Sequence, residues 1–131
     1  MTEPVFVFGS NLAGRHGAGA ALFAREHHGA IYGQGVGLQG NSWAIPVKDG
    51  RGGADLKDPA QTLPLSEIAL YVVAFLAQAK VLYPHLTFQV TPIGCGLAGF
   101  TPEQIAPFFR DAPANVILPD VFLKVLNGGA A

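Results

Sequence analysis

The stretch that decides the fold reads Val5-Phe6-Val7-Phe8-Gly9-Ser10-Asn11-Leu12-Ala13-Gly14-Arg15-His16-Gly17-Ala18-Gly19-Ala20-Ala21. Four apolar residues, typical of a strand covered on both faces, lead into a glycine-rich loop, and the loop leads into a helix start. This order can bind an anion, because glycines let the backbone approach a ligand and the first-turn N–H groups point at it. An ordinary strand-to-helix turn is the alternative, but such a turn rarely needs four glycines.

Composition indicates one globular domain over residues 1–131, because half of the residues are apolar and 13% are charged. A net charge of -1 gives no basis for broad nucleic-acid or membrane-surface binding, although it allows a small phosphorylated ligand. The single cysteine, Cys95, excludes an internal disulfide. Since the chain also opens without a basic, signal-like segment, we expect a cytoplasmic protein that contacts no membrane.

The first half of the chain predicts strands and a helix around glycine-rich loops. We expect a strand at 5–8, a helix at 19–28 closed by Gly29, a short strand at 30–32 and a strand at 41–47. Residues 33–40 are too rich in glycine for regular structure, and residues 48–63 read as a long exposed loop.

The second half predicts a long helix from 65 or 66 to 82. Its unbroken apolar run at 68–77 indicates burial on more than one side, by the sheet and by another helix or subunit, so a homo-oligomer through residues 66–82 is possible. We then expect a strand at 87–91, a second glycine loop at 92–100, a helix capped by Thr101 and shortened or kinked at Pro107, a strand at 115–118 and a helical turn at 121–126.

This order of elements predicts an α/β sandwich with a largely parallel sheet. Ligands of such sheets bind beyond the carboxyl ends of the strands, where both glycine loops would meet. The P-loop and dinucleotide-binding patterns are both absent from the sequence. The histidines and the lone cysteine lack metal-ligand spacing, so we expect neither a metal nor a resident cofactor. Cys95 is either a nucleophile or a buried structural thiol.

The two loops resemble those of the macrodomain family, the ADP-ribose-binding α/β modules. Residues 9–12 resemble the strand exit with the family's asparagine, residues 14–21 its diphosphate loop, and residues 92–100 its second phosphate loop. The second loop is similar to that of the branch that removes ADP-ribose from acidic side chains or DNA bases, and to small phage and bacterial macrodomain-like proteins. The resemblance implies a three-layer α/β/α sandwich. It also implies a set of ligand-binding residues: Gly9, Ser10, Asn11, Leu12, Gly14, His16, Gly17, Gly19, Ala20, Gly94, Cys95, Gly96, Leu97, Ala98, Gly99 and Phe100.

The resemblance further implies ADP-ribosyl hydrolysis by Asn11, Lys48 and Asp49. Lys48 matches a family lysine that attacks or activates the anomeric carbon, but Ala98 stands where an assisting aspartate is expected, so Asp49, Asp120 or an activated water would replace it. For four of these residues a purely structural role stays open. Asn11 would serve to fix its own turn and Phe100 to fill the core, while Lys48 and His16 would be solvated surface residues.

The expected function is therefore binding of ADP-ribose, or of a nucleotide derived from it, with hydrolysis of the ADP-ribosyl bond of a modified protein or nucleic acid. The alternative is a non-catalytic module that binds the same ligand. Adenine selectivity stays open, because few residues precede the first strand to form the early loop that usually contacts adenine.

Overall fold

β1 (Val5–Asn11) is the central strand of a five-stranded sheet. The structure, a computed structural model, describes residues 3–128. The sheet has the order β2-β3-β1-β4-β5, with β2 (Gly37–Gln39), β3 (Ser42–Lys48), β4 (Phe88–Val90) and β5 (Val116–Ile117). β3, β1, β4 and β5 run parallel, and β2 is antiparallel to β3. The prediction of an α/β fold with a mostly parallel sheet is confirmed.

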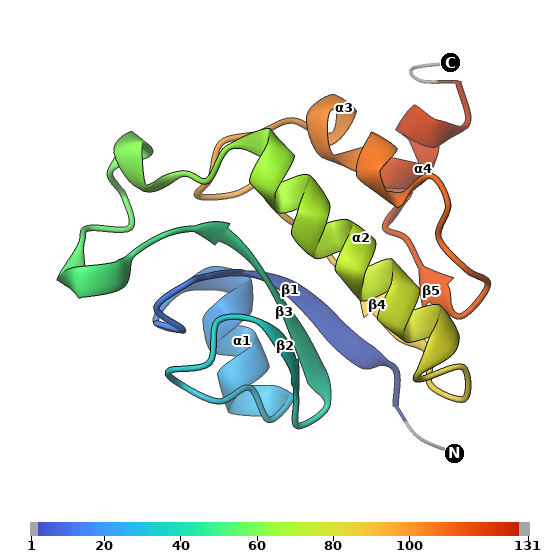
Figure 1. Cartoon of the computed structure of the whole chain (residues 1–131), viewed down its shortest axis with the longest axis horizontal. Coiled ribbons are helices and arrows are strands. Elements are labelled where there is room, and N and C mark those ends of the chain that lie inside the picture. The colour runs from blue at the N-terminus through green and yellow to red at the C-terminus, as the bar shows by residue number, and fades with distance from the viewer. Residues whose placement is uncertain (1–2, 129–131) are drawn as a thin grey trace.

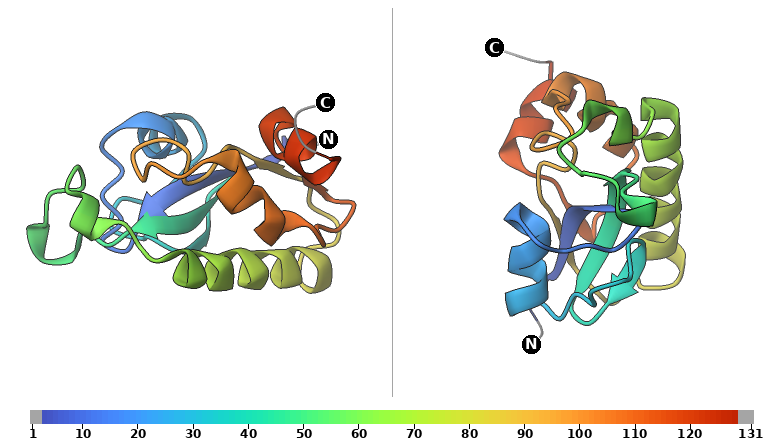
Figure 2. Two further views of the ribbon diagram at one scale, coloured as in Figure 1. Left: turned by 90° about the horizontal axis from the view of Figure 1, so that it is seen from above. Right: turned by 90° about the vertical axis from the view of Figure 1, so that its left-hand side faces the viewer.

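β1 sends alternate side chains to opposite faces, and a helix covers each face (Figures 1 and 2). Val5 and Val7 join the large core beneath α2 (Leu65–Val81). Phe8 joins a smaller core with Ala21 and Ala24 of α1 (Gly19–His27). As predicted, α1 ends before Gly29, a residue with φ of 74°. Residues 5–8 of the strand are therefore all apolar because both faces of the strand are covered.

The C-terminal elements pack against one another and against the large core. They are α3 (Pro102–Ile105), a 3-10 turn at Ala106–Phe109 and α4 (Asp120–Leu126). The rings of Phe109 and Phe122 stack with centroids 5.5 Å apart. The main-chain N–H of Thr101 donates to the side chain of Gln104 at 2.9 Å, and the α-helix gives way to the 3-10 turn next to Pro107. Both the cap and the shortening were expected.

The predicted strand at 30–32 is wrong, and a strand lies instead in the stretch expected to be irregular. The side chain of Gln39 accepts from the main-chain N–H of Ile31 at 2.7 Å and donates to the carbonyl of Gln34 at 3.1 Å. These bonds fold residues 31–39 into a turn. Gly33 and Gly37 take φ of 100° and 89°, which bring β2 alongside β3.

The interpretation of residues 48–63 as an exposed loop is wrong at both ends. Lys48 is the last residue of β3 and is 3% exposed, while Leu63 joins the large core. Lys48 and Thr62 form an isolated antiparallel bridge that closes the segment at its base. The part between them holds two short 3-10 turns, at Arg51–Gly53 and Pro59–Gln61.

Within residues 3–128, α2 buries one face, which packs against the sheet and the C-terminal helical elements as expected, whereas burial of its other face by a second subunit stays a prediction. Ile68, Val72, Phe75, Leu76 and Ala79 form its buried face. Leu70 and Val81, on the opposite face, are each 71% exposed. None of the helices described is both long and apolar enough to cross a membrane.

Candidate functional site

A pocket of about 590 Å³ opens at the carboxyl ends of β1, β3 and β4. The two glycine loops line it from different sides, as the sequence predicted, and the segment after β3 adds a further wall. The lining residues are Gly9, Ser10, Asn11, Arg15, Gly17, Ala18, Gly19, Ala20, Ala21, Tyr32, Val47, Lys48, Asp55, Leu56, Lys57, Thr91, Pro92, Ile93, Gly94, Gly96, Leu97 and Ala98.

Eleven of the predicted site residues lie in this lining: Gly9, Ser10, Asn11, Gly17, Gly19, Ala20, Lys48, Gly94, Gly96, Leu97 and Ala98. Leu12, Gly14, His16, Asp49, Cys95, Gly99 and Phe100 lie outside it. Sequence reasoning missed Tyr32 and the wall formed by Asp55, Leu56 and Lys57. The length of the segment after β3 was the available signal for that wall, because long loops are often functional.

Lys48 places a buried cation at the pocket. Its ammonium group donates to the main-chain carbonyl of Asp58 at 3.2 Å. The ion pair found among residues 3–128 joins Arg51 to Asp49, so no carboxylate in this part of the chain pairs with Lys48. A buried charge without a counter-ion is unfavourable, since the interior solvates it less well than water does. The pocket therefore presents a cation that is suited to an anionic ligand.

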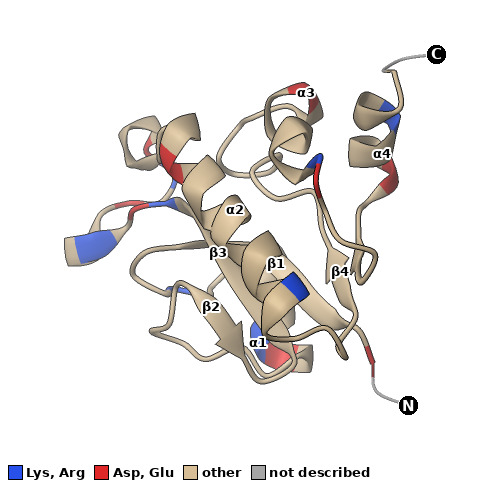
Figure 3. Ribbon diagram, turned by 45° about the vertical axis from the view of Figure 1, so that its right-hand side comes forward, with Lys and Arg blue, Asp and Glu red and all other residues tan. Residues whose placement is uncertain are grey.

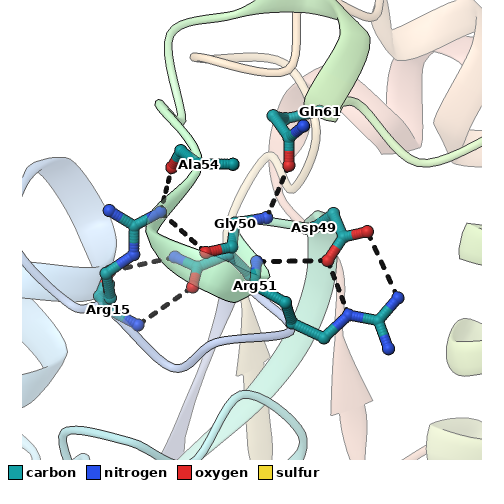
Figure 4. Close-up of polar contacts among 7 residues, drawn as sticks. Arg15, Asp49, Gly50, Arg51, Ala54 and Gln61 are labelled. Carbon is teal, nitrogen blue, oxygen red and sulfur yellow. Dashed lines mark hydrogen bonds and ion pairs between the residues drawn. The ribbon is translucent and has the colours of Figure 1, made fainter.

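Arg15 is a second cation of the pocket, and it too is bound to carbonyl oxygens. Its Nη2 donates to the carbonyl of Gly50 at 2.8 Å and to that of Ala54 (Figure 4). Its Nε is buried and has no partner within residues 3–128. Elsewhere the charged residues are sparse, with both signs interspersed along the ribbon (Figure 3). The positive character of the site is thus local.

Main-chain N–H groups complete the anion-binding potential of the site. Gly96, Leu97 and Ala98 line the pocket, and their N–H groups donate to no other group among residues 3–128. Ala18, the N-cap of α1, forms no side-chain cap, and the first turn of α1 carries no acidic residue. Free N–H groups at a glycine-rich turn and at a helix start are the donors that phosphate oxygens use.

Asn11 fixes the turn that follows β1, which is the alternative role that the sequence left open. Its side-chain amide donates to the carbonyl of Arg15 and accepts from the N–H of Arg15, both at 2.9 Å. Asn11 as a whole is 4% exposed. Ser10 is bound similarly, because its hydroxyl donates to the carbonyl of Gly35.

His16 is fully buried, so its interpretation as an exposed loop residue is wrong. Its ring packs edge-on against Phe8 and Tyr32, with centroids 5.4 and 6.3 Å apart. Neither ring nitrogen has a hydrogen-bond partner in the described chain. Burial, with a contribution from the charge of Arg25, lowers the pKa of His16 below its usual value, against a smaller opposing contribution from the nearby backbone of Gln34. His16 is therefore a neutral aromatic residue that supports the first loop.

Asp49, a predicted catalytic residue, is held away from the pocket by Arg51. Their side chains pair at 2.7 Å, and hydrogen bonds from Arg51 lower the pKa of the Asp49 carboxyl. Asp120, the alternative acid, begins α4 and also lies outside the lining. Among residues 3–128, Asp55 is the carboxylate that lines the pocket.

Cys95 and Phe100 are half-buried and lie outside the pocket lining. Both pack against the large core. Cys95 donates weakly to the carbonyl of Ile93, with Sγ at 3.7 Å, and burial raises the pKa of its thiol, which disfavours the nucleophilic thiolate. No cluster of three or more His, Cys, Asp or Glu side chains that could hold a metal ion occurs in the described part of the chain.

Comparisons with models of protein families, with curated proteins and with solved structures find no match to this chain. The chemistry of the pocket is therefore the guide to its ligand.

Proposed function

We propose that the pocket binds ADP-ribose, or a nucleotide derived from it, with the diphosphate between the two glycine loops. The buried ammonium group of Lys48, which lines the pocket without a carboxylate partner, carries this proposal. The volume of about 590 Å³ suits a ligand of this size. The mostly parallel sheet, covered by a helix on each face, is consistent with the macrodomain-like sandwich that the loops resemble.

The chemistry of each wall matches a part of this ligand. The free N–H groups of Gly96, Leu97 and Ala98 and of the first turn of α1 suit phosphate oxygens. Lys48 and Arg15 supply compensating charge. The apolar side chains of Val47, Leu56 and Ile93 offer surface to the sugar and base.

Hydrolysis of an ADP-ribosyl bond in a modified protein or nucleic acid is the proposed activity. Lys48 is the reactive side chain best placed for it, and Asp55 is the lining carboxylate that replaces the acid absent at Ala98. The second candidate is a module that binds the ligand without turnover. The position of Ala98 in the lining and the bond from Lys48 to the Asp58 carbonyl favour this candidate, because both reduce the groups free for chemistry.

Calorimetric titration with ADP-ribose, with AMP and ribose-5-phosphate as fragment controls, tests the binding. We expect micromolar affinity for the whole molecule and much weaker binding of either fragment. Lys48→Met should lower the affinity for ADP-ribose about tenfold or more, since a charge-assisted hydrogen bond contributes ~1.5–3 kcal/mol. Lys80→Met, at an exposed position of α2 outside the pocket, is the control and should bind normally. No heat at millimolar ADP-ribose would overturn the proposal.

Release of ADP-ribose from modified protein and from modified DNA separates the two candidates. An enzyme should release it, and Asp55→Asn should lower turnover while ADP-ribose still binds. Tight binding without release from either substrate would favour the binding module.

A further inference from the structure

The segment 50–57 forms a wall of the pocket and holds few internal hydrogen bonds: the N–H of Ala54 donates to the carbonyl of Arg51 at 3.5 Å, and that of Lys57 to the side chain of Asp55 at 2.9 Å. It contributes Asp55, Leu56 and Lys57 to the lining. Its regular structure is one 3-10 turn, in which Gly52 and Gly53 take φ of 70° and 78°. Glycine-rich backbone loses much conformational freedom when it is ordered. Bonds to residues outside the segment are therefore important for the position of this wall.

Arg15 supplies two of these bonds, and Asp49 bonds the segment through Arg51. Nη2 of Arg15 donates to the carbonyls of Gly50 and Ala54, which bracket the 3-10 turn (Figure 4). Gly50 has a φ of 72°, which favours glycine, and it is closely surrounded. A Cβ at this position would lie 2.5 Å from the side chain of Leu56 and 3.0 Å from Nη2 of Arg15. The guanidinium group, the turn and the pocket-lining leucine thus pack as one body. The side chain of Gln61 accepts a further hydrogen bond from the N–H of Gly50 at 3.0 Å, which is independent of Arg15.

Asn11 fixes the origin of the Arg15 side chain. Its amide bonds both the N–H and the carbonyl of Arg15, and Asn11 itself ends β1, where it pairs with Lys48 of β3. A continuous series of bonds therefore runs from the sheet through Asn11 and Arg15 to the wall.

We propose that Asn11 and Arg15 form one positioning unit, in which Asn11 acts through Arg15 to hold segment 50–57 against the pocket. In this assignment Asn11 is not a catalytic residue. The order of the wall does not depend on a ligand, whereas the effect of the unit on ADP-ribose affinity rests on the proposed function.

Hydrogen exchange of the ligand-free protein tests the unit. Asn11→Ala and Arg15→Ala should each speed exchange of amides in 51–57 about tenfold, the equivalent of one lost charge-assisted bond, and the double variant should exchange no faster than Arg15→Ala. Amides of β1 and β3 should keep their protection, which separates the effect from global unfolding. Arg51→Ala is the matched control, because this arginine lies in the segment and pairs with Asp49 instead of belonging to the unit. It should change exchange of the amides in 51–57 less than Arg15→Ala does.

Additive effects in the double variant, or wild-type exchange in Asn11→Ala, would overturn the proposal. Asn11→Asp provides a milder variant that keeps the acceptor for the Arg15 N–H, and it should restore part of the protection lost in Asn11→Ala. Full loss in Asn11→Asp would contradict the assigned geometry.

Measuring the ADP-ribose affinity of the same variants separates this proposal from the proposed function. Asn11→Ala should lower the affinity for ADP-ribose when Arg15 is present. In the Arg15→Ala background it should not lower the affinity any further. If the wild-type protein binds no ADP-ribose, the proposed function fails, and the exchange data alone still decide whether the unit exists.

Discussion

Nζ of Lys48 lies 3.2 Å from the carbonyl oxygen of Asp58 and donates to it, at the buried end of β3. A carbonyl dipole compensates an ammonium charge less completely than a carboxylate does. The chain therefore keeps an under-compensated cation at the pocket, as sites that are shaped for a ligand often do at a cost in stability.

Replacing Lys48 by methionine should stabilise the ligand-free protein. The thioether keeps most of the apolar stem and removes the buried charge, so we expect a gain of ~1 kcal/mol and a rise in Tm of about 3 °C. Thermal unfolding with and without ADP-ribose measures both effects: the variant should melt higher alone and gain less from ligand. A lower Tm in the ligand-free variant would show that the bond to Asp58 outweighs the burial of charge.

Replacing His16 by phenylalanine should leave binding intact and keep or raise stability. The ring is buried against Phe8 and Tyr32, and its nitrogens have no partner to lose among residues 3–128. Titration with ADP-ribose and chemical unfolding report on the two properties. A general acid at this position would instead lose turnover with unchanged affinity.

His16 should also make the protein less stable in mild acid. Its pKa is lowered in the folded state, so the unfolded chain binds a proton more readily, and stability falls as the pH drops below 6.5. Above pH 6.5 this contribution to stability is fully present. Unfolding free energies of the wild type and of His16→Phe between pH 5 and 8 isolate the effect. As the pH falls, the wild type should lose stability relative to the variant. A difference that stays constant with pH would rule the effect out.

Gly35→Ala should be severely destabilising, while Gly17→Ala should not. A Cβ on Gly35 would overlap the carbonyl oxygen of Asn11, which is fixed backbone, whereas a Cβ on Gly17 would have no atom within 4 Å. We expect a loss of ~3 kcal/mol or more at Gly35 and under ~1 kcal/mol at Gly17. Urea unfolding of the two variants provides the comparison, and equal losses would mean that the backbone contact can relax.

Asp49→Asn should change ADP-ribose affinity by less than twofold. The carboxylate pairs with Arg51 at 33% exposure and lies outside the pocket. The same assays of binding and release that test Lys48 apply here. A large loss of turnover would restore Asp49 as the catalytic acid.

The sequence predicted the parts of the fold that local signals encode. The apolar run at β1, the glycine that ends α1 and the Thr101 cap each reflect interactions within a few residues. The convergence of the two loops followed from a general rule for parallel sheets.

Contacts between distant residues were beyond such reasoning. Arg15 meets Gly50 and Ala54 across a long stretch of chain, and nothing in either local sequence encodes the pairing. The two roles weighed for Asn11 need the same residue type, so the bonded geometry was required to identify its turn contact. The apolar run of α2 hid a face that the described chain leaves exposed, because periodicity vanishes when every position is apolar.

The close contact of Gly35 with the end of β1 bears on which positions around the pocket can accept substitutions. Gly14 is similarly pressed against the backbone of Gly33 and Gln34, so main chain meets main chain there with no room for side chains. Few substitutions should be tolerated at such a junction, so we expect the strand exit beside it to accept little change. We expect change at a pocket wall instead, where the exposed side chain of Tyr32 can be exchanged without affecting this junction.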